Sequence, residues 1–387
     1  MNICLKLILS GFIIIQLACQ SNDTPMKKDT STTPMAIIGT YTQKEGHVDG
    51  KGFGVGIYKI GPTAQDWKLQ GKFSNIINPS YICLSPKHSI IYAVSEQGGN
   101  APAPKSVVKV LSYDPADYSI KELQSVSALG DAPCYISTDR SGKYLFIANY
   151  GTGNVVQYQI KADGTLHPGI ATQHDGDGPN QNRQEGPHAH YIHQHPQTEE
   201  IYAVDLGSDQ VIRYAATEEG LTSTGSIYVE PGSGCRHLVW HPIHHNIVYI
   251  INELSGTIEA WNWEKDTSNR IQILFLSPAD KAGNPGGGAI EISKDGKFIY
   301  ASIRGDFNEL IVIKIDPATH QLSIIQRVSA GGSAPRHIGL NIKEDYLSVS
   351  LQDDGKIMWF KRDLETGKLE ETPQEVPVAS PVCVQFE

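Results

Sequence analysis

From about Met35 onward, the chain is a succession of short apolar runs that are separated by polar turns. The runs are rich in Val, Ile, Tyr and Phe, and Gly, Asp, Asn and Pro stand between them. The 3.6-residue apolar period of an amphipathic helix is not sustained in this part of the sequence. Because short runs of this composition bounded by turn residues are typical of β-strands, the pattern predicts an all-β protein.

The runs recur as a repeated unit of strand, polar turn and strand. One clear copy is "GCRHLVWHPIHHNIVYIINEL", from Gly234 to Leu254. Equivalent copies begin near Pro79, Pro133, Pro187, Cys235, Ala289, Pro335 and Pro381, and subtraction of these positions gives spacings of 46 to 54 residues. A repeat of about 50 residues has the length of a four-stranded propeller blade. Seven copies therefore predict a seven-bladed β-propeller over residues 36–387.

The last copy contains only a first strand before Glu387. Its missing strands are found at the other end of the chain, where "MAIIGTYT" (Met35 to Thr42) matches the second strand and "GFGVGIYKIG" (Gly52 to Gly61) matches the third. We therefore expect the closing blade to be shared between the N-terminal and C-terminal strands. Such closure leaves no open sheet edge between the first and last blades.

Residues 1–18 have the outline of an export signal, with Lys6, an apolar run from Leu7 to Ile15, and Ala18 before Cys19. The run is too short to predict a membrane span. The pattern resembles a bacterial lipoprotein signal, which predicts lipidation of Cys19 and a disordered tether over residues 19–35. The protein is then expected in the cell envelope, on the periplasmic or outer-membrane side, with the lipid as its only membrane contact. A simply cleaved signal and an uncleaved anchor are the alternatives.

Composition and charge narrow the function classes. The chain has 387 residues, of which 40% are hydrophobic and 19% charged, and this is a globular composition. A net charge of -10 without a Lys/Arg cluster argues against nucleic acid as a partner. The cysteines beyond the signal are Cys83, Cys134, Cys235 and Cys383, without C-x-x-C spacing. This spacing does not predict a zinc ribbon or a redox motif. We expect these cysteines to be small buried side chains and not to form disulfides.

Most equivalent positions of the repeats, here called registers, hold apolar or small residues. Two registers hold polar side chains instead. Counting six back from the turn prolines at 86, 196 and 242 gives Ser80, His190 and Arg236, and the equivalents elsewhere are Cys134, Gly288, Arg336 and Val382. Counting four on from the second-strand aromatic gives Glu96, Tyr150, Leu206, Glu253 and Arg304, with Tyr41 and Gln352 as approximate equivalents. Because first strands line the channel of a propeller, residues of one register are expected to converge there.

The convergent set contains three guanidiniums, two carboxylates and an imidazole, namely Arg236, Arg304, Arg336, Glu253, Glu96 and His190. Arginine donates paired hydrogen bonds to carboxylate or phosphate, so the set suits an anionic, oxygen-rich ligand. Glu or His could deprotonate water, and an arginine could stabilise an oxyanion. Together these groups predict hydrolysis of an ester or lactone, with no metal and no cofactor.

Structural interpretations of the same residues stay open. Arg236 and Glu253 could form an ion pair that only holds two blades together. The histidines at 188, 190, 193 and 195 could form a metal site, although a solvated or turn-forming histidine run has the same spacing. The histidines at 241, 244 and 245 lie in a predicted turn, where surface exposure is the default.

Several motifs together resemble the lactonase family of seven-bladed propellers, which includes bacterial 6-phosphogluconolactonase and the fungal carboxy-muconate lactonizing enzyme. The motifs are "GTYT" (39–42), "ANYGTGNV" (148–155), "GPHAH" (186–190), "RHLVWHP" (236–242), "INEL" (251–254), "IRGDFNEL" (303–310) and "APRHIGL" (334–340). The resemblance implies His190, Arg236, Glu253 and Arg304 as catalytic residues. We add Arg336 and Glu96 from the register count, and His237, as substrate-binding residues. Cys235 stands where family members commonly have proline.

The resemblance implies ring opening of a small anionic sugar lactone in the central channel. 6-Phosphogluconolactone is made in the cytoplasm, so the predicted export signal favours an extracytoplasmic sugar-acid lactone instead. Two other functions remain: a non-catalytic ligand-binding propeller tethered to the envelope, and a cycloisomerase that interconverts a muconate-type diacid and its lactone.

Overall fold

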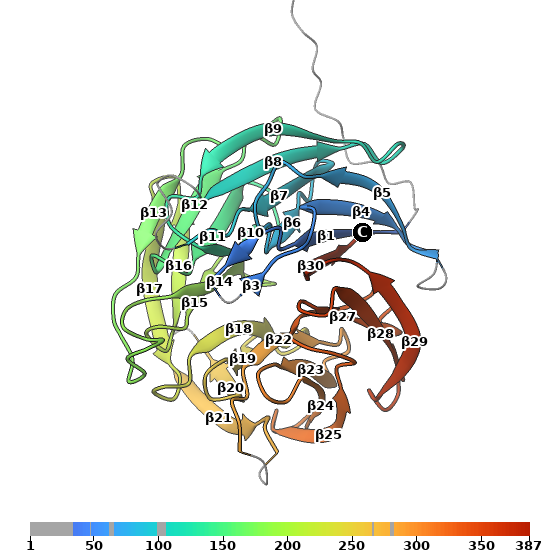
Figure 1. Ribbon diagram of the computed structural model, residues 1–387. Coiled ribbons are helices and arrows are strands. Elements are labelled where there is room, and N and C mark those ends of the chain that lie inside the picture. Colours follow the sequence, from blue (N-terminus) through green and yellow to red (C-terminus); the bar gives the residue numbers. More distant parts are fainter. Residues whose placement is uncertain (1–33, 47, 62–65, 99–105, 265–266, 279–281) are drawn as a thin grey trace, which may run out of the picture.

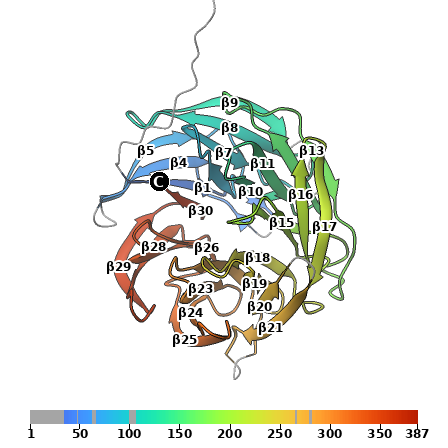
Figure 2. The same ribbon diagram turned by 180° about the vertical axis from the view of Figure 1, so that it is seen from behind.

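The computed structural model describes residues 34–46, 48–61, 66–98, 106–264, 267–278 and 282–387. Within these ranges the chain forms seven four-stranded antiparallel sheets arranged in a ring (Figures 1 and 2). The prediction of a seven-bladed β-propeller is confirmed. The predicted signal, Cys19 and most of the predicted tether lie outside the described residues, and Met35 is already the first residue of a strand. Across the described ranges, no helix is long and apolar enough to cross a membrane.

Six blades are continuous in sequence and run outward from a first strand at the channel. The first two of these blades consist of β6 (Ile82–Leu84), β7 (Ile90–Val94), β8 (Val107–Tyr113) and β9 (Ile120–Ser127), and of β10 (Pro133–Thr138), β11 (Tyr144–Asn149), β12 (Asn154–Gln159) and β13 (Ile170–Gln173). The next two consist of β14 (Ala189–Gln194), β15 (Ile201–Asp205), β16 (Gln210–Thr217) and β17 (Gly220–Tyr228), and of β18 (Cys235–Trp240), β19 (Ile247–Asn252), β20 (Thr257–Trp263) and β21 (Ser268–Phe275). The last two consist of β22 (Gly287–Ile292), β23 (Phe298–Ile303), β24 (Glu309–Ile315) and β25 (Leu322–Ser329), and of β26 (Pro335–Leu340), β27 (Tyr346–Leu351), β28 (Lys356–Arg362) and β29 (Leu369–Pro377).

The seventh blade closes the ring with strands from both ends of the chain. Its order is β30 (Pro381–Phe386), β1 (Met35–Thr40), β4 (Val55–Lys59) and β5 (Lys68–Phe73). β1 pairs with β30 antiparallel, with Ile38 opposite Val384, and Figure 1 shows these two strands side by side. The predicted closure is confirmed. A short hairpin of β2 (Lys44–Glu45) and β3 (Val48–Asp49) follows β1.

The core lies between the blades, where the second and third strands present apolar side chains to both neighbouring sheets. Every residue of β11, β19 and β23 is buried, whereas the fourth strand β17 is largely exposed. Trp240 and Trp263 pack on Tyr202 of the preceding blade, at ring-centroid distances of 4.8 and 4.9 Å. The four described cysteines are free thiols, as predicted. Burial of apolar surface between neighbouring blades is the main stabilising interaction of such a ring.

A β-bulge interrupts the first strand of most blades close to its start. The residues that fall in the register shifts include Cys134, His190, Arg236, Gly288, Arg336 and Val382. These are the residues of the first predicted register, except Ser80, which precedes β6. A bulge bends the strand and re-aims a side chain. The repeated bulge therefore turns this register toward one mouth of the channel.

Candidate active site

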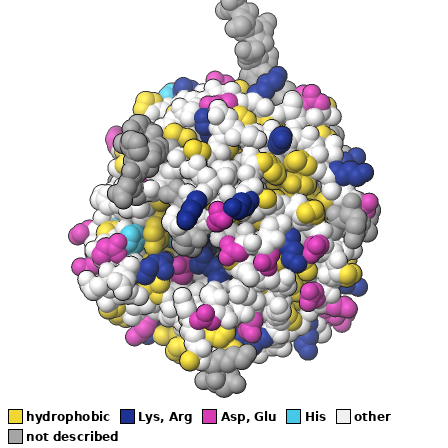
Figure 3. All heavy atoms as spheres, in the orientation of Figure 1, with side chains coloured by type: hydrophobic (Ala, Val, Ile, Leu, Met, Phe, Trp, Pro, Cys, Tyr) yellow, Lys and Arg dark blue, Asp and Glu magenta, His cyan; other side chains and the backbone are white. Residues whose placement is uncertain are grey.

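A cavity of about 810 Å³ occupies the mouth of the channel where the first strands begin and the second strands end. Five of the predicted site residues line it: Glu96, His190, Glu253, Arg304 and Arg336. Glu96, Glu253 and Arg304 lie within two residues of the end of a second strand. His190 and Arg336 lie in the bulges of first strands. The space-filling view shows Lys and Arg side chains gathered near the middle of one face of the ring (Figure 3). The two registers therefore converge as predicted.

Glu253 is the centre of the polar network in this cavity. Its Oε2 accepts hydrogen bonds from Arg236 Nε at 3.0 Å and from Arg304 at 2.8 Å, and its Oε1 accepts one from Arg183 at 2.7 Å. The Glu253 side chain is 12% exposed. Burial by itself raises the pKa of this carboxyl, but the charges of Arg304, Arg236 and Arg183 outweigh burial and hold the pKa well below its usual range. Glu253 is thus a carboxylate at neutral pH and a weak base.

His190 lies beside this network as a buried imidazole. It is 6% exposed, it lines the cavity, and its Nδ1 has no hydrogen-bond partner among the described residues. Burial, followed by the charge of Arg236, lowers the pKa of His190 well below its ordinary value. The ring is therefore neutral at physiological pH, and a neutral imidazole has one nitrogen that can accept a proton.

A second, smaller group occupies the other side of the cavity. Arg336 approaches Glu96 Oε2 at 3.4 Å and lies over the ring of Tyr41 at 5.1 Å. The Tyr41 hydroxyl donates to the same Glu96 oxygen at 2.9 Å. Tyr41 follows β1 and Arg336 lies in β26, so this group joins the closing blade to its neighbours across the channel.

Arg236 lies behind the cavity wall rather than on it. It is 2% exposed, and besides Glu253 it donates from Nη1 to the Gly288 carbonyl oxygen at 2.7 Å. Burial, followed by the charge of Arg304, lowers the pKa of Arg236 to about 10. Arg236 is therefore placed to hold Glu253 in position, and not to contact a ligand in this conformation.

The expectation that His237 binds substrate is not supported by its position. His237 is outside the described lining of the cavity and packs against Tyr135 and Tyr191 at ring-centroid distances of 5.3 and 5.7 Å. The bulge explains the difference, because it turns the residue after Arg236 away from the mouth and into the channel.

An aromatic layer fills the channel below the cavity. Tyr81 and Tyr135 lie 4.1 Å apart, Tyr135 and Tyr191 lie 4.5 Å apart, and Tyr81 lies 6.0 Å from His337 by ring centroids. A second cavity opens at the opposite mouth, and it shares no described lining residue with the first. The arginine-lined cavity is therefore a blind pocket rather than one end of an open pore.

Arg183 is the contributor that the sequence analysis does not identify. It lies in the long loop between β13 and β14, where it donates to the Tyr150 hydroxyl at 3.2 Å as well as to Glu253. The loop is held by Gln184, whose amide donates to the Leu206 carbonyl oxygen at 2.9 Å. The Arg183 side chain is 41% exposed, the highest of the three Glu253 partners. Its only signal in the sequence is an arginine inside a Gly-rich loop.

The histidines at 188, 190, 193 and 195 point to different places. His188 stacks on Tyr150 at 4.5 Å, His193 lines the opposite cavity, and His195 bonds to the His245 carbonyl oxygen at 2.8 Å. In the part of the chain that the structure describes, no group of three or more His, Cys, Asp or Glu side chains is placed to hold a metal ion. Cys134 lines the arginine cavity, but burial raises the pKa of its thiol, so it is not an activated nucleophile.

Comparisons with known proteins agree with this architecture. The profile of the family described as "Lactonase, 7-bladed beta-propeller" matches residues 35–386. The chain is 31% identical over 363 residues to the 6-phosphogluconolactonase of Bacillus subtilis (strain 168), covering 92% of this chain and 99% of the relative. The structure is similar to the periplasmic gluconolactonase of Pseudomonas aeruginosa, with 29% identity, a TM-score of 0.82 and coverage of 91% and 98%. A protein from Lactobacillus plantarum is 30% identical, with a TM-score of 0.83 and coverage of 92% and 100%.

Proposed function

Because the chain belongs to the lactonase family of seven-bladed β-propellers, we propose that it hydrolyses a small lactone of a sugar acid in the arginine-lined cavity. The names of two relatives, a 6-phosphogluconolactonase and a periplasmic gluconolactonase, support a gluconolactone-type substrate. The predicted export signal and the second of these relatives favour the unphosphorylated lactone.

The observation that carries this proposal is the arrangement around Glu253. Three guanidiniums bond to one carboxylate, and a neutral imidazole with an unpaired nitrogen lies beside them. A site that is rich in preorganised N–H donors stabilises negative charge as it develops on oxygen. Ester and lactone hydrolysis develops such charge on the carbonyl oxygen, so the cavity fits this reaction.

In the proposed reaction, water attacks the lactone carbonyl carbon while His190 accepts a proton from it. Arg304 and Arg183, which line the cavity, stabilise the oxyanion that forms on the carbonyl oxygen. The bond from carbon to the ring oxygen then breaks, and the leaving oxygen receives the proton from His190. The product is a hydroxy acid that ionises to the carboxylate. Glu253 keeps the guanidiniums in place, because both of its oxygens already accept bonds from them.

The oxyanion that forms in the reaction would strengthen His190 as a base. Burial and the charges of nearby arginines lower the pKa of His190 in the free protein. The negative charge that develops on the carbonyl oxygen offsets part of the arginine charge and raises the pKa of His190 toward the working pH, where general bases are most effective. The base thus gains strength during the reaction, and the lactone itself needs no charge.

The direct test measures opening of δ-gluconolactone and of its 6-phosphate by the purified protein, with spontaneous opening subtracted. We expect acceleration, with preference for the unphosphorylated substrate. Glu253→Gln is expected to lose about 10²–10³ in kcat because the guanidiniums lose their shared anchor. Glu365→Gln, in an exposed turn, is the matched control and should keep full activity.

Two results would contradict the proposal. Binding of both compounds without turnover would indicate a ligand-binding propeller. Loss of the diene absorbance of a muconate-type diacid, with no lactone hydrolysis, would indicate the cycloisomerase.

A further inference from the structure

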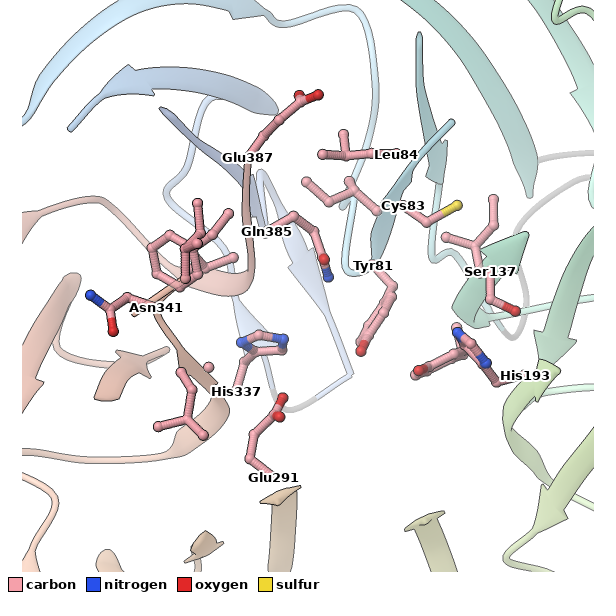
Figure 4. Close-up of a pocket in the computed structure, with 18 of the residues that line it drawn as sticks. Tyr81, Cys83, Leu84, Ser137, His193, Glu291, His337, Asn341, Gln385 and Glu387 are labelled. Carbon is pink, nitrogen blue, oxygen red and sulfur yellow. The ribbon is translucent and has the colours of Figure 1, made fainter. Parts of the chain in front are cut away.

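The mouth opposite the arginine cavity contains a cavity of about 740 Å³ that the proposed reaction does not use. It lies where the first strands end, and residues from six blades line it, including Tyr81, Ser137, His193, Glu291, His337 and Gln385. Figure 4 shows these side chains converging from different strands around the channel axis. The aromatic layer separates it from the arginine cavity.

The charge of this mouth is opposite to that of the arginine cavity. Three carboxyl side chains line it, those of Glu291, Glu344 and Glu387, and the cationic lining residue is Lys294, whose side chain is 73% exposed at the rim. Glu344 is paired with Lys294 at 3.8 Å and with Arg362 at 3.7 Å. Glu387 accepts a hydrogen bond from the Tyr113 hydroxyl.

Glu291 is different, because its side chain forms no ion pair and no hydrogen bond with any described residue. Its carboxyl is half-buried and lies near His337 and Tyr81 in Figure 4. An ionised carboxyl that is withdrawn from water without a partner is costly, so Glu291 is ionised at neutral pH only when a ligand brings a positive charge to it.

His337 is the second observation that points to a ligand. It is 7% exposed, it lines the cavity, and its Nδ1 is buried without a partner among the described residues. Burial, followed by the charges of Arg236 and Arg336, lowers the pKa of His337 to about 4. The ring is therefore neutral, and it offers a nitrogen acceptor beside Glu291 and the ring of Tyr81 (Figure 4).

We propose that this mouth is a second binding site, for a small organic ammonium cation with Glu291 as its counter-ion. A carboxylate supplies the opposite charge, and the rings of Tyr81 and Tyr135, which line the cavity, supply aromatic surface of the kind that attracts ammonium groups. The absence of a guanidinium from the described lining disfavours an anion, and the one lining lysine, Lys294, lies at the exposed rim beside Glu344. A metal ion needs more ligands than Glu291 provides, since no described residues form a metal-binding group there.

Binding of a cation at this site requires Glu291 to release its proton. Burial, followed by the charge of Glu344, raises the pKa of Glu291 to about 8. The other titratable groups that line the cavity are Glu344, Glu387, Lys294, His193, His337, Tyr81, Tyr135 and Cys83, and burial raises the pKa of the Cys83 thiol. Burial lowers the pKa of both histidines and raises that of both tyrosines, so none of these four changes charge near neutral pH. Below pH 8 Glu291 must lose its proton to pair with a cation, so affinity should rise with pH up to about 8 and then level off.

Calorimetric titration with choline tests the proposal, and 3,3-dimethylbutan-1-ol serves as the neutral probe of the same shape. We expect saturable one-site binding of choline at pH 9, at least tenfold weaker binding at pH 6, and weaker binding of the alcohol at both. Glu291→Gln should bind choline at least tenfold more weakly at pH 9. The matched control is Glu370→Gln on the exposed strand β29, which should bind like the wild type. Circular dichroism shows that each variant is folded.

No saturable choline binding at pH 9 would overturn the proposal. So would equal affinity for choline and the neutral alcohol, because the cavity would then be only an apolar pocket. Unchanged choline binding by folded Glu291→Gln would also overturn it.

Discussion

At the residue scale, the guanidiniums around Glu253 determine which groups in the cavity can accept a proton. They hold the pKa of Glu253 well below its usual range although burial raises it, and Arg236 contributes to lowering that of His190. At neutral pH Glu253 is therefore a carboxylate and His190 a neutral imidazole. Both oxygens of Glu253 are occupied by N–H donors, whereas His190 has an unpaired nitrogen. This difference favours His190 as the base and leaves Glu253 as the group that orients the arginines.

His190→Asn should lower kcat by about 10²–10⁴, the range of a lost general base. The wild-type pH profile gives an independent readout. Protonated His190 cannot accept a proton, and its pKa is lowered, so kcat/KM should be flat above pH 6.5 and fall only in acid. With the 6-phosphate as substrate, the pKa in the kcat profile should be higher than in the kcat/KM profile, because the bound phosphate offsets the arginine charges.

The matched control for this prediction is His244→Gln, which changes an exposed turn histidine and should leave both profiles unchanged. An acid limb that persists unchanged in His190→Asn would show that another group is the base.

Arg183 is the most exposed of the three Glu253 partners and is placed to release Glu253 and contact substrate. Removing a hydrogen bond to a charged group costs about 1.5–3 kcal/mol, so Arg183→Ala should raise KM by about tenfold or more. It should lower kcat as well, because Arg183 also stabilises the oxyanion in the proposed reaction. Arg183→Lys should restore only part of the affinity, because an ammonium lacks the planar pair of donors. Steady-state kinetics measure both effects.

The control for loss of an arginine is Arg327→Ala, on the outer strand β25. This substitution removes an ion pair with Glu309 of β24. If it raised KM as much as Arg183→Ala does, the effect would be one of stability and not of contact with substrate.

At the scale of elements, the bulge in the first strand explains why the site could be predicted from the repeats. The strand carries the bulge at the same place in most blades, so a fixed count from the turn proline finds His190 and Arg236, and the equivalent position of another repeat is Arg336. The second register predicts residues of the site correctly because each second strand ends at the mouth that contains the arginine cavity. The fold followed from the same spacing, including the closing blade, since an unpaired first strand needs partners from the other end of the chain.

The counts fail where the repeat does not apply. Arg183 lies in a loop that has no equivalent in the other blades, so no register finds it. His237 comes from neither count, and the bulge at Arg236 turns it into the channel, where it joins the aromatic layer. Sequence also could not show that Arg236 lies behind Glu253, because depth within the channel wall depends on packing.

Gly287 at the start of β22 holds two site residues together through its backbone. Its N–H donates to the Glu253 carbonyl oxygen at 3.0 Å, and its carbonyl oxygen accepts from Arg304 at 3.2 Å. A methyl group here would meet the Asn252 carbonyl oxygen and lie 3.3 Å from Glu253 Cα. Gly287→Ala should therefore displace Glu253 and lower kcat by about 10-fold or more, since displacements of about 1 Å can cost 10²-fold.

Gly186→Ala is the control, because an added methyl group there has no atom within 4 Å. It should keep wild-type kcat and melting temperature. A Gly287→Ala variant with normal kcat would show that the site tolerates movement of the strand end.

At the scale of the whole molecule, ring closure places the two mouths of the channel relative to the start of the described chain. Met35 N–H donates to the carbonyl oxygen of Glu387, which lines the acidic cavity. Six residues later, Tyr41 bonds to Glu96 at the arginine cavity. β1 thus crosses the ring from the acidic mouth to the arginine mouth, and the N-terminal segment joins the propeller on the face opposite the proposed active site.

This topology gives the predicted lipid anchor a functional consequence. We propose that Cys19 is lipidated, so that the arginine cavity opens away from the membrane while the protein is anchored. The chain between Cys19 and Pro34 can span at most about 50 Å, and the acidic face would then lie nearest the bilayer. Lipid labelling of cells should mark the wild type, and Cys19→Ala should be unlabelled and soluble. Membrane-bound wild type and soluble Cys19→Ala should hydrolyse δ-gluconolactone with the same kcat/KM, because the anchor does not obstruct the mouth. A several-fold lower value for the membrane-bound form would mean that the arginine mouth faces the membrane, and an unlabelled wild type would remove the anchor and restore the phosphorylated lactone as the preferred substrate.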